Sequence, residues 1–382
     1  MPERIAILKK KFKEFYPEGG MPVVVAGPGR INIIGEHVDY AGGFVLPAAV
    51  DREILLAASN RKDRELRFFS LDYNEGFETS LDNLQFSGLK RWANYLQGVF
   101  FFLKEKGLLL NGANIVFSGN IPKGGGMSSS AALEVAVCFA LRLLNGFKLS
   151  DLELVKLCQK AENNFVGVRC GIMDQFACTM SKAENLLFLD CRDLSYQLIP
   201  ADFFGIAIVL ADTKKDRSLA GSEYNLRREQ VTRAAEILGN PLRDISIPEF
   251  EAEKERLDSI LRKRAKHVIY EIDRTKQAVE ALKKRDILRL GRLLYQTHES
   301  LKTDFEVSCR ELDILVELAL GVKGVVGSRM MGGGFGGCTI TLVKEEAVSE
   351  LKDKLSKEYL KLSGRKTELW VCKLSDGVRQ VQ

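Results

Sequence analysis

The chain has 382 residues, of which 46% are hydrophobic and 28% are charged, a composition typical of a soluble globular protein rather than a fibrous or disordered one. At about 150 residues per domain, this length favours two or three compact units. Fifty-six lysines and arginines against 51 aspartates and glutamates leave a formal charge of +5, and the sequence pI of 8.6 lies below the range typical of nucleic-acid binders.

The first half of the chain is predicted to mix strands with helices. An apolar, β-branched run at residues 23–25 predicts a strand that enters a turn at Gly27-Pro28-Gly29. A glycine-rich loop at residues 121–126 joins a strand to a helix that Gly146 ends. The elements expected in this half are helices at residues 4–16, 128–145, 150–165 and from 174, and strands at 54–59, 66–70, 114–118 and 185–190.

The second half is predicted to contain a second sheet flanked by helices. Its expected elements are strands at residues 203–211, 338–343 and 367–373, helices at 222–238 and 345–362, and a charged helical region at 253–284 that is broken once or twice. No linker rich in Pro, Gly or Ser separates the halves. We place the domain boundary near Ser195, which gives domains at residues 1–195 and 196–382.

Cysteine usage and hydropathy bear on the compartment. Eight cysteines occur without a Cys-x-x-Cys pair, and Cys138, Cys158 and Cys178 lie in apolar segments. Such cysteines indicate reduced core thiols. No apolar run approaches the 18 residues of a membrane helix, and no signal-peptide apolar region is present at the N-terminus. We therefore expect a cytoplasmic protein without membrane or nucleic-acid partners.

The segment from Lys123 to Ala131, Lys-Gly-Gly-Gly-Met-Ser-Ser-Ser-Ala, joins a strand to a helix. Its glycines let backbone N–H groups approach a ligand, and the helix N-terminus adds positive potential, so the pattern indicates an anion site. Serines stand where a P-loop has its lysine, which argues against a P-loop NTPase. A serine N-cap after a flexible loop is the structural alternative.

A second glycine run, Gly332-Gly-Gly-Phe-Gly-Gly337, fits the G-x-G-x-x-G pattern of dinucleotide-binding proteins. A strand follows it at residues 338–343, whereas the dinucleotide fingerprint opens into a helix, so this class is excluded. The run is compatible with a backbone surface along a nucleotide phosphate, or with a purely structural tight turn.

Between Gly29 and Tyr40 the sequence concentrates hydrogen-bonding groups in one expected loop. Arg30, Glu36, His37 and Asp39 offer the donors and acceptors that a polyhydroxylated ligand such as a sugar requires.

A histidine-based metal site is not expected, because the chain has only three histidines. His267 and His298 lie far along the chain in charged helical segments, where we expect surface or capping roles. Glu162 is expected late in a helix, as an Mg²⁺ ligand or a solvated carboxylate. Asp174 follows a glycine-bounded loop, as a catalytic acid or a helix N-cap.

Six segments in order, spread over nearly the whole chain, resemble the galactokinase family within the galactose, homoserine, mevalonate and phosphomevalonate (GHMP) kinase superfamily. They are residues 29–40, 124–132, 170–175, 222–228, 305–312 and 332–338. The resemblance implies an α+β fold of two domains, with mixed sheets flanked by helices and an active site in the cleft between them. It also implies Mg-ATP and galactose as ligands, with phosphorylation of the anomeric hydroxyl of α-D-galactose, the first step of the Leloir pathway.

Residue roles follow from the resemblance by position. Arg30 and Asp174 correspond to the catalytic pair, and Ser130 and Glu162 to the Mg²⁺ ligands. The positions that correspond to galactose contacts are Glu36, His37, Asp39, Gly171 and Tyr224. Those that correspond to the ATP phosphate loop are Gly124, Gly125, Gly126, Ser128, Ser129 and Ser130, while Gly332 to Gly337 corresponds to the third family motif.

Three positions depart from the family pattern. Ala41 replaces an Asn, Asn163 replaces a His, and Arg169 replaces an apolar residue or Pro. Loss of a polar group at position 41 leaves open a kinase for another sugar, such as N-acetylgalactosamine. A sugar sensor without turnover is a further alternative, which the intact serine run, Glu162 and Asp174 disfavour. We expect a monomer, with a weak homodimer as the alternative.

Overall fold

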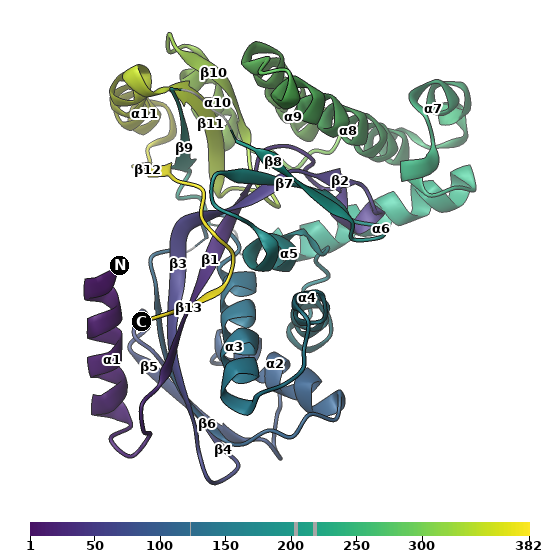
Figure 1. Cartoon of the computed structure of the whole chain (residues 1–382). Coiled ribbons are helices and arrows are strands. Elements are labelled where there is room, and N and C mark those ends of the chain that lie inside the picture. Colours follow the sequence, from purple (N-terminus) through teal and green to yellow (C-terminus); the bar gives the residue numbers. More distant parts are fainter. Residues whose placement is uncertain (123, 202–204, 217–219) are drawn as a thin grey trace.

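The computed structural model describes residues 1–382 except residues 123, 202–204 and 217–219. It also leaves out the side chains of residues 220 and 221. Lys123, at the start of the predicted anion loop, and Phe203, at the start of a predicted strand, therefore lie outside the described residues. The described residues form an α+β fold with three sheets (Figure 1). This fold class agrees with the prediction.

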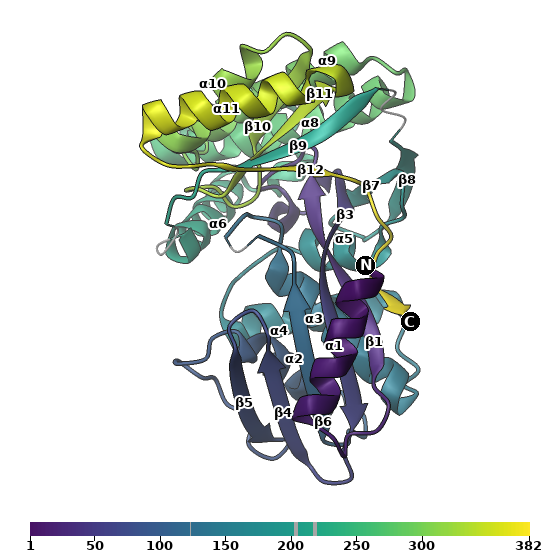
Figure 2. The same ribbon diagram turned by 90° about the vertical axis from the view of Figure 1, so that its left-hand side faces the viewer.

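The first sheet has six strands in the order β13-β1-β3-β6-β4-β5. Its strands are β1 (Val23–Asn32), β3 (Pro47–Asn60), β4 (Glu65–Ser70), β5 (Glu75–Ser80), β6 (Ala113–Gly119) and β13 (Arg379–Val381). Helix α1 (Pro2–Phe15) covers one face. The helices on the opposite side are α2 (Ala93–Glu105), α3 (Ser129–Asn145), α4 (Asp151–Ala161) and α5 (Met173–Met180) (Figures 1 and 2).

Alternation along β1 explains why both faces of this sheet are covered. Val24 and Ala26 pack in the cluster that contains Leu8 and Phe12 of α1. Val25, between them, belongs to the larger core on the side of α3. Successive side chains of a strand point to opposite faces, so the continuous apolar run at residues 23–26 requires helices on both sides.

The second sheet has the order β10-β11-β9-β12, with helices on both faces. Its strands are β9 (Ile206–Asp212), β10 (Val325–Met330), β11 (Cys338–Lys344) and β12 (Glu368–Cys372). Helices α10 (Arg310–Leu320) and α11 (Val348–Ser363) pack on one face, and α9 (Ile287–Thr303) packs on β10 from the other. The remaining helices of this half are α6 (Ala220–Leu238), α7 (Ile247–Glu253) and α8 (Ser259–Lys283).

A third, small sheet of β2 (Phe44–Val45), β7 (Asn185–Asp190) and β8 (Tyr196–Pro200) lies between the two larger ones (Figure 1). The boundary placed near Ser195 falls in the turn between β7 and β8. After β12 the chain returns to the first sheet, where β13 pairs with β1. The division at residues 195 and 196 stays a prediction.

The short helical turns are Asp39–Ala41, Glu162–Val166, Leu242–Asp244, Lys254–Arg256 and Glu345–Ala347.

The elements agree with most of the predicted ranges, but the turn expected at Gly27-Pro28-Gly29 was wrong. Strand β1 continues through these residues to Asn32 and shifts register between Pro28 and Arg30. A proline has no N–H to donate, and the irregularity lets the strand pass it without losing its pairing to β3. Arg30 therefore lies on a strand and not in a loop.

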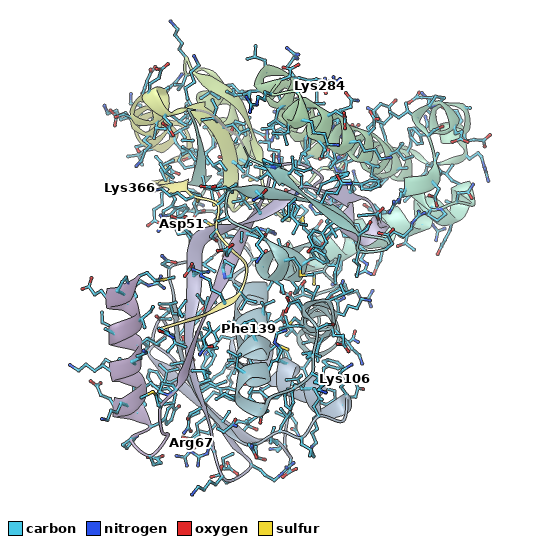
Figure 3. The ribbon with its side chains drawn as sticks, in the orientation of Figure 1. Asp51, Arg67, Lys106, Phe139, Lys284 and Lys366 are labelled. Carbon is cyan, nitrogen blue, oxygen red and sulfur yellow. The ribbon has the colours of Figure 1, made fainter. Side chains whose placement is uncertain are left out.

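Charged side chains such as Lys106 and Lys284 lie at the surface (Figure 3). Among the helices of the described part of the chain, none combines the length and apolar character needed to cross a membrane. All eight cysteines are free.

Candidate active site

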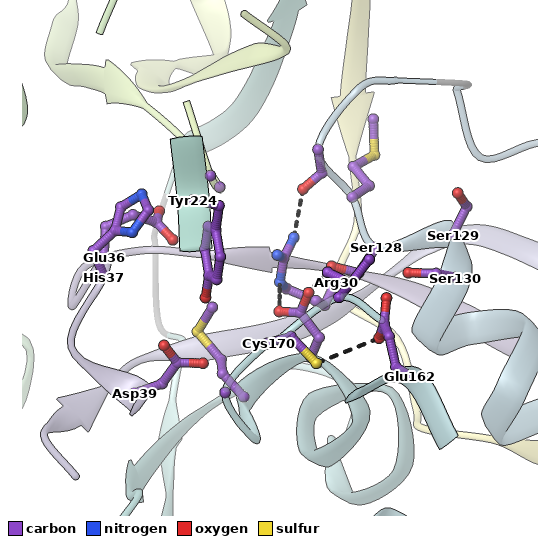
Figure 4. A pocket seen from close by; sticks show the side chains of 18 of the residues that line it. Arg30, Glu36, His37, Asp39, Ser128, Ser129, Ser130, Glu162, Cys170 and Tyr224 are labelled. Carbon is purple, nitrogen blue, oxygen red and sulfur yellow. Dashed lines mark hydrogen bonds and ion pairs between the residues drawn. The ribbon is translucent and has the colours of Figure 1, made fainter. Parts of the chain in front are cut away.

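A cavity of about 300 Å³ lies where the first sheet meets the second half of the chain. Every residue given a catalytic, metal, galactose or phosphate-loop role by the resemblance lines it except Gly125, and of the third family motif only Gly332 and Gly333 do. Figure 4 shows Arg30 in its middle, with Glu36, His37 and Asp39 toward one end and Ser129, Ser130 and Glu162 toward the other. The cavity thus brings together five separate parts of the sequence, residues 30–39, 122–130, 162–174, 224 and 332–333.

An ion pair between Arg30 and Asp174 occupies the centre. Arg30, near the end of β1, donates from Nε to Oδ1 of Asp174 at 2.8 Å and from Nη1 to the carbonyl of Gly126 at 2.5 Å. Asp174 lies in the first turn of α5, and its second oxygen accepts a hydrogen bond from Ser128. Burial opposes the charge of Arg30, but the negative charges of Asp174 and Glu36 raise its pKa, so a fixed positive charge stands in the cavity.

The glycine and serine segment begins α3 beside this pair. Gly124 and Gly126 have φ values of 74° and 72°, and Ser128, at the N-cap position, has a left-handed φ of 56°. Ser128 makes no side-chain capping bond to the helix and uses its hydroxyl for Asp174 instead. Ser128 thus occupies the N-cap position, as the structural alternative expected, but its side chain does not cap the helix. The first turn of α3, with its positive helix-dipole end, begins at the cavity.

Glu162 lies at the end of the cavity opposite Glu36, His37 and Asp39, in the π-helical turn after α4. Gln175 donates from Nε2 to Glu162 at 2.6 Å, and the hydroxyl of Ser130 also hydrogen-bonds to it. Burial, followed by the negative charge of Asp174, raises the pKa of Glu162 to about 7. The charge of this carboxylate is thus incompletely compensated in the described structure, and a cation beside it would stabilise the ionised form.

Aromatic rings and carboxylates line the other end. The ring of Tyr224, from α6, lies 5.3 Å from that of His37 and 5.6 Å from that of Tyr40. Burial, followed by the charge of Asp174, raises the pKa of Asp39 to about 6. A Cβ atom at Gly171 would lie 1.9 Å from Oδ2 of Asp39, so only glycine leaves room for this carboxylate. The arrangement offers donors, acceptors and apolar ring faces to a small polar ligand.

Sequence reasoning missed the groups behind Glu36. Arg329 of β10 is fully buried, and its Nη1 lies 2.7 Å from Oε2 of Glu36. Glu271 of α8 is also fully buried and bonds to the backbone of Gly35 and Glu36. These residues lie more than 230 positions from their partners, so no local motif marks them.

The surface or capping roles expected for two histidines were wrong. His267 is fully buried, and its Nε2 lies 3.0 Å from the carbonyl oxygen of Glu36. His298 is 2% exposed, and it lies 3.3 Å from Asp313 and from the backbone N–H of Met330. Both histidines lie on the packed faces of their helices. Their charged neighbours in the sequence had suggested exposure to solvent.

The three departures from the family pattern lie outside the residues that line the cavity. Asn163 accepts a hydrogen bond from the thiol of Cys170 at 3.3 Å, and so supports a lining residue. Arg169 is largely exposed and lies 3.6 Å from Glu229. Ala41 ends the short helical turn that carries Asp39.

Three family models match the chain. A galactokinase galactose-binding signature covers residues 10–60, a GHMP kinase N-terminal domain covers 94–182, and a GHMP kinase C-terminal domain covers 278–361. Among curated proteins, the galactokinase of Roseiflexus sp. is 41% identical over 381 residues, with 98% of this chain and 96% of that protein covered. The galactokinase of Clostridium tetani is 39% identical, with 98% and 97% covered.

Solved structures of a galactokinase and of another GHMP kinase also match the chain. Galactokinase of Lactococcus lactis complexed with galactose superposes with a TM-score of 0.96 at 35% identity, covering 99% of this chain and all of that one. Mevalonate kinase of Methanococcus jannaschii matches with a TM-score of 0.66 at 20% identity over 94% of this chain and 99% of that one, which shows a shared fold.

Proposed function

The chain belongs to the galactokinase family of the GHMP kinase superfamily, and from this premise we propose how its residues carry out the reaction. The reaction is the transfer of the γ-phosphoryl group of ATP to the anomeric hydroxyl of galactose. Such a transfer requires positioning of the two substrates and neutralisation of charge, with little covalent chemistry by the protein.

The observation that carries the residue assignment is the arrangement around Asp174. Asp174 accepts hydrogen bonds from Arg30 and Ser128. It lies between the end of the cavity that contains Asp39 and the end that contains Glu162. We assign the Asp39 end to galactose and the α3 end to the phosphates of ATP. A hydroxyl and a γ-phosphate would then meet beside the ion pair.

In this assignment Asp174 orients the attacking hydroxyl and receives its proton late, and Arg30 stabilises the charge that develops on the transferred group. Orientation matters more than basicity here, since the transition state of phosphoryl transfer is loose. The N–H groups at the start of α3 and the hydroxyl of Ser129 would bind the phosphate oxygens, whereas the single hydroxyl proton of Ser128 is donated to Asp174.

Ser130 and Glu162 are the residues that we propose to hold Mg²⁺. Hydroxyl and carboxylate oxygens are the ligands that Mg²⁺ prefers, and it usually binds through one or two carboxylates together with substrate phosphates. The raised pKa of Glu162 fits this role, because a carboxylate buried near Asp174 gains a partner when a cation binds. When bound, the ion would neutralise charge on the phosphates of ATP.

We propose that Glu36, His37, Asp39, Gly171 and Tyr224 form the galactose site. The carboxylates accept bonds from sugar hydroxyls, and the ring of Tyr224 covers an apolar face. Gly171 contributes by leaving room for Asp39. We also propose a cytoplasmic, monomeric protein that acts on small molecules alone. Eight free cysteines support that compartment.

The test is ATP-dependent ADP release by the purified protein with galactose, N-acetylgalactosamine, glucose, arabinose or no sugar, with the phosphorylated position of each product identified. We expect turnover with galactose and a C1 phosphate. Turnover only with another sugar would place the specificity elsewhere. Bound ATP and galactose without turnover would indicate a sensor.

A further inference from the structure

The segment Gly35–Glu36–His37 has a backbone that must be held in place. Gly35 has a φ of 92° and His37 a φ of 58°. A left-handed conformation costs a residue with a side chain about 1 kcal/mol or more, and it persists where the surroundings fix it. Glu36 is 2% exposed and His37 is 4% exposed. The segment therefore owes its shape to the groups packed behind it.

Glu271 of α8 holds the amide side of this segment. Its Oε1 accepts the backbone N–H of Gly35 at 2.9 Å and that of Glu36 at 3.2 Å. Its Oε2 accepts from Arg274 at 2.7 Å and from Thr297 at 2.8 Å. Both oxygens thus have two donors each, which keeps this fully buried carboxylate ionised and fixed.

His267, one turn earlier on α8, holds the carbonyl side. Burial lowers the pKa of His267 to about 4, so the ring is neutral near pH 7. A carbonyl oxygen only accepts, so the hydrogen bond of 3.0 Å to Glu36 requires the proton on Nε2. Nδ1 lies 2.9 Å from the hydroxyl oxygen of Ser300, which is also 3.2 Å from Oδ2 of Asp304. The peptide groups on both sides of Glu36 are therefore fixed by α8.

Arg329 of β10 holds the side chain of Glu36. Its guanidinium donates to Oε2 of Glu36 at 2.7 Å, to the carbonyl of Ile33 at 2.8 Å and to the carbonyl of Asn32 at 2.5 Å. A planar fork with several acceptors fixes both the position and the orientation of the carboxylate. The end of β1 is tied to β10 by the same group.

We propose that Glu271, His267 and Arg329 are positioning residues that shape the Gly35–His37 segment for galactose, and that they set the affinity for galactose separately from that for ATP. The three groups come from α8 and β10, whereas the phosphate side is built by β1, α3 and α5. This inference rests on the proposed function, in which Glu36 and His37 contact the sugar.

Glu271→Gln tests the inference with little change in volume. The amide oxygen can still accept from the backbone, but the amide nitrogen cannot accept from Arg274, so the ionic partner is lost. We expect a KM for galactose raised roughly 10-fold, as for a misaligned pair of hydrogen bonds. The KM for ATP and kcat at saturating galactose should each change by less than about 3-fold.

A matched control separates positioning from general loss of stability. Val279 lies on the same helix, buried in the apolar core. Val279→Ala should lower the unfolding temperature and leave both KM values unchanged, because it packs in the core and makes no hydrogen bond to the segment. Arg329→Lys is the second variant. The ammonium of lysine cannot donate to all the acceptors that the guanidinium of Arg329 reaches. Arg329→Lys should therefore also raise the KM for galactose and leave that for ATP little changed.

Two results would overturn the inference. One is an unchanged KM for galactose in both Glu271→Gln and Arg329→Lys, and the other is an equal rise of both KM values. Asp39→Asn distinguishes this failure from that of the proposed function. If Asp39→Asn raises the KM for galactose and the two other variants do not, the positioning role alone fails. If Asp39→Asn also has no effect, the galactose site itself is wrongly assigned.

Discussion

Asp174 has both carboxylate oxygens engaged, one by Arg30 and one by Ser128, so its position is fixed before any substrate arrives. Asp174→Asn keeps the shape of this side chain and removes its charge. We expect turnover to fall roughly 100-fold or more, because an amide cannot take the proton of the attacking hydroxyl, while galactose binding stays measurable by calorimetry. Asp190→Asn is the matched control, since Asp190 also pairs with an arginine, Arg243, outside the cavity. Near-normal turnover in Asp174→Asn would refute the assignment.

Glu162 bears on the metal requirement. Glu162→Ala removes one proposed oxygen ligand, so the Mg²⁺ concentration for half-maximal activity should rise roughly 10-fold in a titration at fixed ATP. Glu311→Ala, which removes a carboxylate from α10 outside the cavity, should leave the titration unchanged. The same midpoint in both variants would contradict a role for Glu162 in holding the ion.

The raised pKa of Asp39 predicts that galactose binding depends on pH. Because burial and Asp174 raise its pKa to about 6, the carboxylate is ionised at pH 7 and protonated at pH 5. A protonated carboxyl loses negative charge and part of its acceptor capacity. If only the ionised form binds, the KM for galactose should rise roughly 10-fold from pH 7 to pH 5. Asp39→Asn should abolish this dependence, and an unchanged pH profile in that variant would attribute it to another group.

At the scale of elements, the contact between β1 and α3 places Arg30 beside the serine loop. A Cβ atom at Gly27 would lie 2.4 Å from the carbonyl oxygen of Ala132 and 2.9 Å from the Cβ of Ala136. Gly27→Ala should therefore lower the free energy of unfolding by about 2 kcal/mol in urea denaturation, through overpacking. Gly88→Ala, where the space is open, should have no measurable effect. Equal stability of the two variants would show that α3 can move aside.

Elements with strong local signals could be predicted from the sequence. Ser150 and Glu153 form a capping box at the start of α4, and Gly146 ends α3 in a left-handed conformation. Helix α2 was missed, since its apolar run from Val99 to Leu103 lacks a clear amphipathic period. The course of β1 through Gly27-Pro28-Gly29 could not be predicted, because pairing with β3 overrides the local turn signal.

At the scale of the whole molecule, the residues that line the cavity were largely predictable, and those that support it were not. Arg30, Asp174 and Glu162 stand in recognisable motifs. Glu271 and Arg329 stand in segments without one, and their partners lie 235 and 293 positions away for the contacts with Glu36. The role of a buried charged residue depends on its tertiary contacts, and a single sequence carries no local signal for contacts between such distant positions.

The return of the chain to the first sheet also contributes to stability. Val378 donates its N–H to the carbonyl of Cys178, and Arg379 pairs with the buried Glu53 at 2.6 Å. Removal of residues 376–382 exposes an edge of β1 and leaves Glu53 without its cation. The unfolding temperature should fall by about 1–3 °C in differential scanning calorimetry, the shift that a loss of 1–2 kcal/mol produces in a chain of this length. Removal of Gln382 alone is the control, and equal midpoints would show that β13 contributes nothing.

This pairing also constrains the order of events during synthesis. Val24 pairs with Val381, so the first sheet is completed only when residues far along the chain from β1 have left the ribosome. Contacts between such distant positions form late, because closing a long loop must precede them. The nascent chain can bury most of its N-terminal core early while β1 keeps an open edge. That edge is an exposed pairing surface until β13 has been made, and it is the place where a stalled chain would associate with another.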